Sequence, residues 1–317
     1  MPKEIFEAGL VICTSRSDPE EVPRHTHGWK IDINEMTKQP FEVDIRAVHT
    51  SHLQLSLMRY HTAAMIDGGY PEGTVIFSSI GTEGLIHEKN RRYATHDLIV
   101  LDDRKPFDLV VSSPCSIYTI AIEREILERE FESFFKQPFA RVYREEDIYL
   151  EPAQCEAFRT LFREQMEQLE VFSEREVSGE EYAAMEIEIL KTLFSSFLFR
   201  PKRISYLPRY IREGRTLLEE HIGAPYTIAD LAEELGISQR TLQHGFKHYL
   251  GFTPKEYQQY IRLNAIRKTI LNVKDPAATL SGIAAKYNYS HSGHFSAEYK
   301  KFFGESPSET LRRVQGR

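Results

Sequence analysis

Side chains able to read DNA bases occur twice near the C-terminal end of the chain. Arg can bond guanine through two N–H groups, Gln can bond adenine in the same two-point way, and Lys or Ser can hold phosphate oxygens. For any one such residue, a solvated polar surface explains the sequence equally well. The residues predicted to reach bases are Arg240, Thr241, Gln243 and His244 in a first segment, and Ser292, Gly293, His294 and Ser296 in a second. Those predicted to hold phosphates are Ser238, Lys247, Thr253, Ser290, Lys300 and Ser306.

Both segments belong to an internal repeat. Leu231-Ala-Glu-Glu-Leu-Gly-Ile-Ser238 aligns at an offset of 52 residues with Ile283-Ala-Ala-Lys-Tyr-Asn-Tyr-Ser290. Further along the chain the offset becomes 53, and Gly251-Phe-Thr-Pro-Lys-Glu256 meets Gly304-Glu-Ser-Pro-Ser-Glu309. Such self-similarity predicts two copies of one structural unit rather than two unrelated helical hairpins.

Each copy has the layout of a helix-turn-helix unit. Thr227 can cap a first helix with its hydroxyl, and Asp230 favours the positive end of that helix. Gly236 supplies a left-handed turn residue, and Asn288 takes the same place in the second copy because Asn tolerates that conformation. Between the copies, residues 254–271 predict one helix of about 27 Å, close to the roughly 34 Å between successive major-groove faces of DNA. One chain could therefore reach two adjacent grooves.

The N-terminal two-thirds of the chain changes from a strand pattern to a helix pattern. Over about 1–125, runs such as 41–48 and 53–60 predict strands of an antiparallel barrel or sandwich. Over about 126–200, apolar residues recur at helical spacing. A dimer contact and packing onto the barrel are equally good uses of these stripes. Their members are Phe158, Leu161, Phe162, Met166 and Leu169, then Met185, Ile189, Leu193, Phe194 and Phe197.

Charge and proline content indicate a boundary between two domains. The basic stretch 201–208 contains two prolines and follows the second helical stripe. From Arg209 onward there are 16 Lys and Arg against 11 Asp and Glu, a net charge of +5, whereas the preceding part carries 24 against 36, a net of −12. We therefore predict an α+β protein with an effector-binding and dimerisation domain over 1–200, a linker over 201–208 and a DNA-binding domain over 209–317.

The region from about 209 to 313 resembles the DNA-binding domain of the AraC/XylS family of transcription regulators. The resemblance is carried by Leu231–Ser238, Leu242-x3-Phe246-Lys247, Gly251-x-Thr253-Pro254 and 302–307. It implies two helix-turn-helix units joined by a long helix, promoter DNA as partner and, in most members, activation of RNA polymerase. Members often carry Arg where His244 and Ala297 stand. The second unit is therefore expected to position the protein more than to read bases.

The remaining part more loosely resembles the cupin-like sensing and dimerising half of many family members, through 97–101 and 107–112. This implies a cupin-like β-barrel or roll, a small-molecule effector and a homodimer. A barrel lumen is the usual place for such an effector. The candidate lining residues are Trp29, Arg46, Arg59, Tyr60, His61 and Tyr118.

The sequence predicts neither a catalytic residue nor a cofactor. His25-x-His27 and His49-x2-His52 have ligand-like spacing, but the Glu and Gly positions that metal-binding cupins use around such a motif are missing, so no metal is expected. Nucleophile elbows and phosphate-binding Gly-rich loops are absent. Two rival interpretations remain: a cupin-type metalloenzyme tethered through its C-terminal part to DNA or a partner, and a constitutive dimeric DNA binder without an effector.

Cellular location follows from what the chain lacks. No apolar run is long enough to span a membrane, and the N-terminus has no secretory pattern. The three cysteines lie far apart, which is typical of a reducing compartment. We therefore expect a cytoplasmic protein that does not bind membranes.

Overall fold

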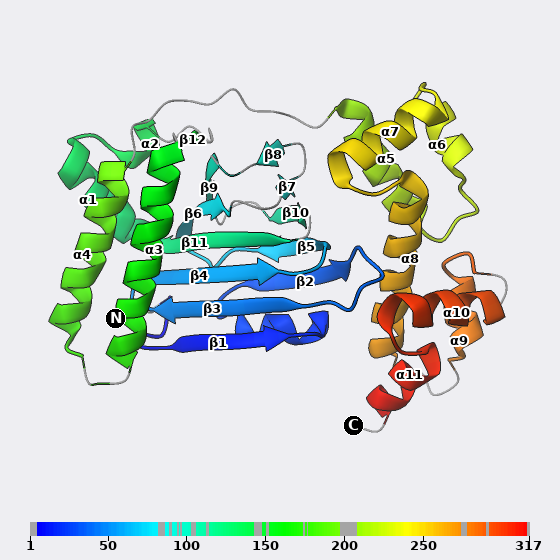
Figure 1. The fold of residues 1–317 in the computed structure, drawn as a ribbon, viewed down its shortest axis with the longest axis horizontal. Coiled ribbons are helices and arrows are strands. Elements are labelled where there is room, and N and C mark those ends of the chain that lie inside the picture. Colours follow the sequence, from blue (N-terminus) through cyan, green and yellow to red (C-terminus); the bar gives the residue numbers. More distant parts are fainter. Residues whose placement is uncertain are drawn as a thin grey trace. The chain divides into compact units, whose positions relative to one another are not determined.

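The chain forms two compact units in the computed structural model (Figure 1). The N-terminal unit comprises Met1–Ile33, Glu42–His61 and Ile66–Ser205, and the C-terminal unit comprises Asn34–Phe41, Thr62–Met65 and Tyr206–Arg317. The structure describes residues 5–81, 86–88, 91–93, 95, 97–102, 106–111, 114–142, 148–149, 152–173, 175, 177–196, 208–273, 278–289 and 292–315. The predicted linker 201–208 lies outside these ranges except for Pro208.

Within the described ranges, the N-terminal unit is built on two β-sheets, as the strand pattern predicts. The seven-stranded sheet has the order β1 (Val11–Arg16), β3 (Val43–His49), β4 (Leu53–Tyr60), β11 (Cys115–Glu123), β6 (Thr74–Ile80), β9 (Asp97–Asp102) and β12 (Ile148–Tyr149). The five-stranded sheet has the order β2 (Lys30–Glu35), β5 (Ala64–Gly69), β10 (Phe107–Val111), β7 (Ile86–Glu88) and β8 (Arg91–Tyr93). A short 3₁₀ helix, η1 (Pro19–His25), follows β1.

The larger sheet uses strand alternation to bury both of its faces. On β4, Leu53 and Leu55 belong to an apolar core shared with helices, whereas Gln54 and Ser56 line a cavity on the other side. Successive side chains of a strand point to opposite faces, so each strand contributes to both. The helices that cover the apolar face are α1 (Arg124–Phe135), α2 (Phe139–Val142), α3 (Pro152–Ser173) and α4 (Gly179–Ser196).

The apolar stripes of α3 and α4 are consumed by this packing. Phe158 and Phe162 of α3 and Ile189 and Leu193 of α4 are at most 1% exposed and lie in the core beneath the sheet. Of the two uses that the sequence left open, the structure shows packing onto the sheet. These stripes are therefore not a free surface for a second chain, and the homodimer remains a prediction. Phe197 lies outside the described residues.

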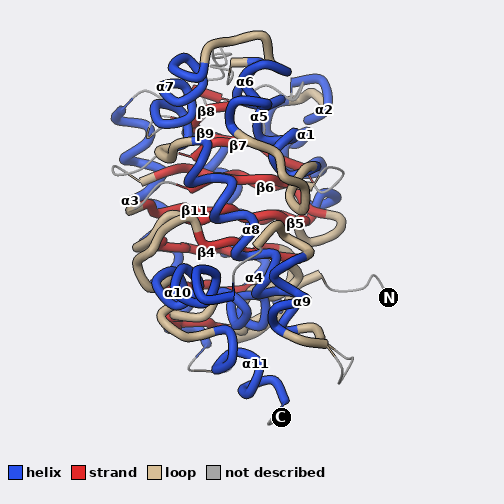
Figure 2. The backbone as a smooth tube through the Cα atoms, turned by 90° about the vertical axis from the view of Figure 1, so that its right-hand side faces the viewer, coloured by secondary structure: helices blue, strands red, loops and turns tan. Residues whose placement is uncertain are grey.

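The C-terminal unit is helical, and one long helix organises it. Figure 2 shows α8 running between one group of helices, α5 to α7, and another, α9 to α11. Helix α8 begins at Pro254 and ends at Leu271, as predicted. Its buried residues include Tyr257, Leu263 and Ile270, and it packs against helices of both groups. The other bounds are α5 (Arg209–Glu220), α6 (Ile228–Glu234), α7 (Gln239–Leu250), α9 (Leu280–Ala285), α10 (Ser292–Phe303) and α11 (Pro307–Gln315).

Candidate DNA-binding helices and ligand cavity

The turns of the two helix-turn-helix units have the backbone conformation that the repeat predicts. Gly236 has φ +65° between α6 and α7, and Asn288 has φ +62° between α9 and α10. In this left-handed region Gly is unstrained, and Asn is among the few other residues that enter it readily. The prediction is confirmed at both positions, and each turn delivers the chain into the second helix of its unit.

Local caps fix the two helices of the first unit. Thr227 Oγ1 accepts from Asp230 N at 3.1 Å, and Asp230 Oδ2 accepts from Thr227 N at 2.8 Å, which forms a capping box on α6. The hydrogen bonds from Thr227 lower the pKa of Asp230. Ser238 caps α7 by accepting from Thr241 N at 3.1 Å, and the two hydroxyls lie 2.8 Å apart. Both predicted DNA contacts are thus tied to the start of α7.

Helix α7 packs through one face and leaves the other free for a ligand. Leu242 and Phe246 are fully buried. Gly245 allows close approach to α5, because a Cβ there would lie 2.4 Å from Tyr210 Oη. The predicted base-reading and phosphate residues gather on the opposite face and are all exposed: Arg240, Thr241, Gln243, His244 and Lys247.

The second unit exposes a different set. Phe295, Tyr299 and Phe302 bury one face of α10, while His294, Ser296 and Lys300 are exposed on the other. The remaining predicted contacts are only partly placed. Ser292 and Gly293 open α10 but their side chains are not described, and Ser290 lies outside the described residues.

Like Ser238, two further predicted phosphate ligands, Thr253 and Ser306, cap helices. Thr253 caps α8, since its Oγ1 accepts from Glu256 N at 3.2 Å and donates to Glu256 Oε2 at 2.9 Å. Ser306 stands in the same place before α11, and its Oγ accepts from Glu309 N at 3.3 Å. A capping hydroxyl satisfies a free helix N–H, so these two side chains already have partners within the chain. Lys247 Nζ donates to Gly251 O at 3.0 Å and keeps two further N–H groups for a phosphate.

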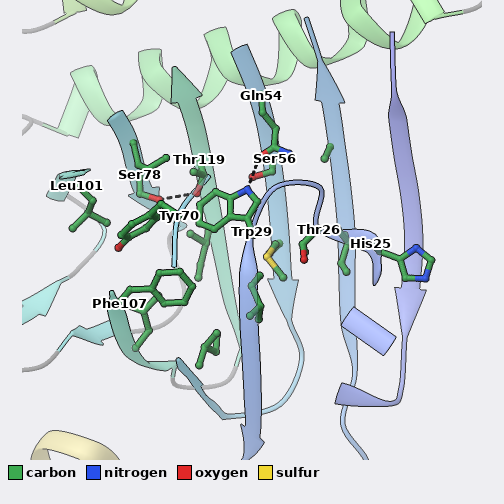
Figure 3. Close-up of a pocket in the computed structure, with 18 of the residues that line it drawn as sticks. His25, Thr26, Trp29, Gln54, Ser56, Tyr70, Ser78, Leu101, Phe107 and Thr119 are labelled. Atoms are coloured by element: carbon green, nitrogen blue, oxygen red, sulfur yellow. Dashed lines mark hydrogen bonds between the residues drawn. The ribbon is translucent and has the colours of Figure 1, made fainter. Parts of the chain in front are cut away.

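A cavity lies within the N-terminal unit (Figure 3). The space between its lining residues, open solvent at the mouth included, is about 690 Å³. Of the six candidate effector residues, Trp29 and Tyr60 line it. Lining residues that sequence reasoning missed include Gln54, Tyr70, Ser78, Phe107 and Thr119.

Arg46 and Tyr118 lie on the opposite face of the sheet from the cavity. Arg46 Nη2 donates to Glu170 Oε1 of α3 at 2.5 Å. The ring of Tyr118 packs against Phe162, with centroids 5.4 Å apart. Strand alternation is the cause, because the cavity residues on β3 and β11 are the neighbours of these two. Assigning them to the cavity chose the wrong face.

Arg59 and His61 also lie away from the cavity lining. Arg59 is exposed, next to the cavity residue Tyr60 on β4. His61 Nε2 lies 2.8 Å from Asp44 Oδ2, which joins two neighbouring strands at their ends. The hydrogen bonds from Ser15 and His61 lower the pKa of Asp44. Both candidates therefore lie at the C-terminal end of β4, outside the cavity lining.

A chain of polar side chains runs from the cavity wall into the protein. Trp29 Nε1 donates to Gln54 Oε1 at 2.6 Å, and Gln54 Nε2 lies 2.5 Å from His49 Nε2. His49 Nδ1 lies 2.8 Å from Leu10 O. Burial lowers the pKa of His49 to about 4, so the ring is neutral near pH 7, donates from Nδ1 and accepts at Nε2. The indole orientation is thus fixed by a complete hydrogen-bonded chain.

The histidines with ligand-like spacing are not assembled around one point. His27 and His49 meet edge to face with ring centroids 5.7 Å apart, whereas His52 pairs with Glu123. In the part of the chain that the structure describes, no group of three or more His, Cys, Asp or Glu side chains has the arrangement of a metal site.

Residues 231–313 match the protein family described as a helix-turn-helix domain. The C-terminal unit contains an AraC-type helix-turn-helix domain. A probable thc operon regulatory protein of Rhodococcus erythropolis is 39% identical over 117 residues, which are 37% of this chain and 35% of that protein. The resemblance stated from the sequence is therefore confirmed, and the chain is related to AraC/XylS-type transcription regulators.

Two further proteins extend the comparison. XylDLEGF operon transcriptional activator 1 of Pseudomonas putida is 25% identical over 230 residues, 72% of this chain and 71% of that protein. The crystal structure of a probable AraC family transcriptional regulator from Rhodopseudomonas palustris is 30% identical, covering 34% of this chain and 98% of that one with a TM-score of 0.32. The chain spans about a third of the length of the Rhodococcus protein that it matches.

None of the helices in the described ranges is both long and apolar enough to cross a bilayer.

Proposed function

We propose that the chain is a sequence-specific, DNA-binding transcription regulator, acting as an activator, whose affinity for promoter DNA is set by a small molecule in the cavity of the N-terminal unit. The observation that carries the proposal is the exposed polar face of α7, where Arg240, Gln243 and Lys247 stand together above a fully buried face. Such a face suits the major groove, which admits one helix and presents acceptor and donor groups to it.

The first unit reads bases and the second places the domain on the duplex. Arg240 and Gln243 supply two-point hydrogen bonding toward guanine and adenine. The second unit exposes His294, Ser296 and Lys300, which suit phosphate contacts and single hydrogen bonds. Helix α8 carries both units, so one chain engages adjacent grooves.

The N-terminal unit acts as the sensor. Its two sheets and internal cavity support a cupin-like fold with an effector inside. An effector that binds the DNA-competent state better than the other shifts the population toward DNA binding, and by linkage DNA tightens effector binding by the same factor. We further propose that the protein acts as a homodimer and contacts RNA polymerase when bound at a promoter. The activator assignment is supported by the description of the Pseudomonas putida relative.

The proposal is tested with the full chain and DNA from upstream of its own gene. We expect the Arg240→Ala, Gln243→Ala double variant to lose roughly a hundredfold in specific affinity, at about 1–3 kcal/mol for each lost two-point contact. The matched control is Arg163→Ala with Gln168→Ala, the same residue types exposed on α3. Equal affinities for the wild type, the variant and the control would overturn base reading by α7.

A further inference from the structure

The cavity has an aromatic corner built from three rings. Trp29 and Tyr70 meet with ring centroids 5.5 Å apart, Tyr70 and Phe107 at 4.9 Å, and Trp29 and Phe107 at 6.1 Å. Figure 3 shows the three side chains turned toward one another on one side of the lined space. Tilted and edge-to-face contacts of this kind are favourable for aromatic rings, so a further ring can join them.

Apart from Tyr60 and His25, the rest of the lining is apolar or carries neutral polar groups. Ile45, Ile76 and Ile117 of the larger sheet are apolar walls. Two pairs of polar groups are hydrogen-bonded within the lining: Ser78 Oγ lies 2.7 Å from Thr119 Oγ1, and Trp29 Nε1 donates to Gln54 Oε1 (Figure 3). A neutral hydroxyl or carbonyl of a ligand can share such groups without leaving a charge unpaired.

The ionisable side chain at the margin of the lining is His25. It lies at the end of η1, and Arg16 Nη2 donates to its Nε2 at 2.8 Å. That guanidinium also lies 3.8 Å from Glu21 and is not among the lining residues. The local positive charge is thus directed at His25 and Glu21 rather than at the aromatic corner.

We propose that the cavity takes an uncharged small molecule with an aromatic ring and one neutral hydrogen-bonding group, and that it discriminates against carboxylates and amines of the same shape. The inference rests on the proposed function, since it names the effector class of that site. The physical reason is desolvation. A carboxylate or an ammonium group enclosed by these walls loses its water and meets no Asp, Glu, Lys or Arg side chain among the described lining residues, which is far costlier than burying a neutral hydroxyl.

The chain contains its own reporter for this experiment. Trp29 is the single tryptophan of the sequence and lines the aromatic corner. Its fluorescence therefore reports the cavity of the full-length protein without contributions from another indole, and it does so without DNA.

The probes are benzyl alcohol, benzylamine and benzoate, which share one ring and differ in charge near pH 7. We expect benzyl alcohol to change the Trp29 emission in a saturable way, and benzylamine and benzoate to bind about a hundredfold more weakly. Equal or tighter binding of either charged probe would overturn the proposal. So would the absence of a saturable response to all three.

Variants show whether the response comes from the cavity. Ser56→Phe fills the space from β4, whereas Arg59→Ala changes an exposed residue of the same strand and is the control. We expect the first to abolish the benzyl alcohol response and the second to retain it, with circular dichroism showing that both fold. Met58→Lys places a cation among the lining residues, so benzoate should gain at least about tenfold. Unchanged probe preference in a folded Met58→Lys protein would count against desolvation as the cause.

Failure of this inference is distinguishable from failure of the proposed function. If a charged probe binds as tightly as benzyl alcohol or more tightly while the α7 variants still lose specific DNA binding, the regulator assignment stands and only the effector class is wrong. If benzyl alcohol binds most tightly but the wild type and the α7 variants have equal affinity for DNA, the cavity assignment stands and base reading by α7 does not.

Discussion

The two helix-turn-helix units share a backbone plan but differ in the side chains they expose. Arg240, Gln243 and His244 of α7 align, at the offset of 53, with Gly293, Ser296 and Ala297 of α10. Only the first set combines an Arg and a Gln, the two side chains best suited to two-point base contacts. The positively charged residue common to both units is Lys247, aligned with Lys300, and Lys serves phosphate. The two units therefore share a backbone arrangement but expose side chains with different hydrogen-bonding groups.

At buried positions, too, aligned residues of the two units are in contact but have different side chains. In the first unit Phe246 meets the ring of Tyr257 edge to face, with centroids 5.9 Å apart. In the second unit the aligned pair is Tyr299 and Thr310, joined by a hydrogen bond of 3.0 Å. The second unit thus has a buried hydrogen bond where the first has an aromatic contact.

The largest expected difference between the units concerns DNA affinity. Replacing His294 and Ser296 with Ala should lower specific affinity less than about threefold, against the roughly hundredfold loss expected for Arg240 and Gln243, because single hydrogen bonds discriminate less than two-point contacts. Fluorescence anisotropy with labelled promoter DNA measures both variants at one salt concentration. Equal losses would mean that the second unit also reads bases, and the division of roles would be wrong.

A second difference concerns how closely α5 packs against α7, the helix predicted to contact bases. Gly245→Ala should destabilise the protein by about 2 kcal/mol, because its Cβ would lie 2.4 Å from Tyr210 Oη and 2.9 Å from Ile211 Cδ1. This loss exceeds the roughly 1 kcal/mol that Ala gains over Gly in a helix. The aligned residue of α10 is Glu298, which already has a Cβ.

Urea denaturation measures the effect, and a double-mutant cycle tests its cause. In a Tyr210→Ala background the Gly245→Ala change should cost clearly less, since the closest clashing atoms are gone. Strictly additive effects of the two substitutions would show that the close packing of α5 on α7 is not the reason.

The comparison also shows which features a sequence can reveal. The left-handed turns at Gly236 and Asn288 and the bounds of α8 were predictable because the chemistry that dictates them is local and repeats. Side-chain exposure on α7 followed in the same way, since the helical period fixes which residues share a face once a few buried positions are known. Because the unit occurs twice, each sequence pattern could be checked against a second copy in the same chain.

The cavity was harder to predict because strand alternation leaves two choices of face. Arg46 and Tyr118 have the right types for a binding site, but the larger sheet is covered on their side by helices far along the chain. Nothing within β3 or β11 indicates which side those helices take. Gln54 and Ser78 carry no signal at all, since a lone polar residue in a strand is usually solvated. Trp29 and Tyr60 were found by residue type alone.

The smallest expected difference lies in the caps of the first helices. Thr227 and Asp230 form a reciprocal capping box on α6, whereas the aligned pair on α9 is Thr279 and Gly282, where only the Thr hydroxyl accepts. The folded pKa of Asp230 is lowered by its hydrogen bonds from Thr227, so its contribution is present above the unfolded value of 3.8 and is lost as pH falls through the folded pKa. Of the two helices α6 and α9, only α6 should therefore lose cap stability in acid.

Hydrogen exchange, corrected for the intrinsic pH dependence of the amide rates, resolves the two helices. Asp230→Ala should speed exchange in α6 at neutral pH and leave α9 unchanged, and it should remove the acid-dependent weakening of α6. Glu233→Ala, an exposed carboxylate one turn further along α6, is the control, since it lies outside the cap and should have little effect. If both variants loosen α6 equally, the asymmetry reflects net charge near the helix and not the capping box.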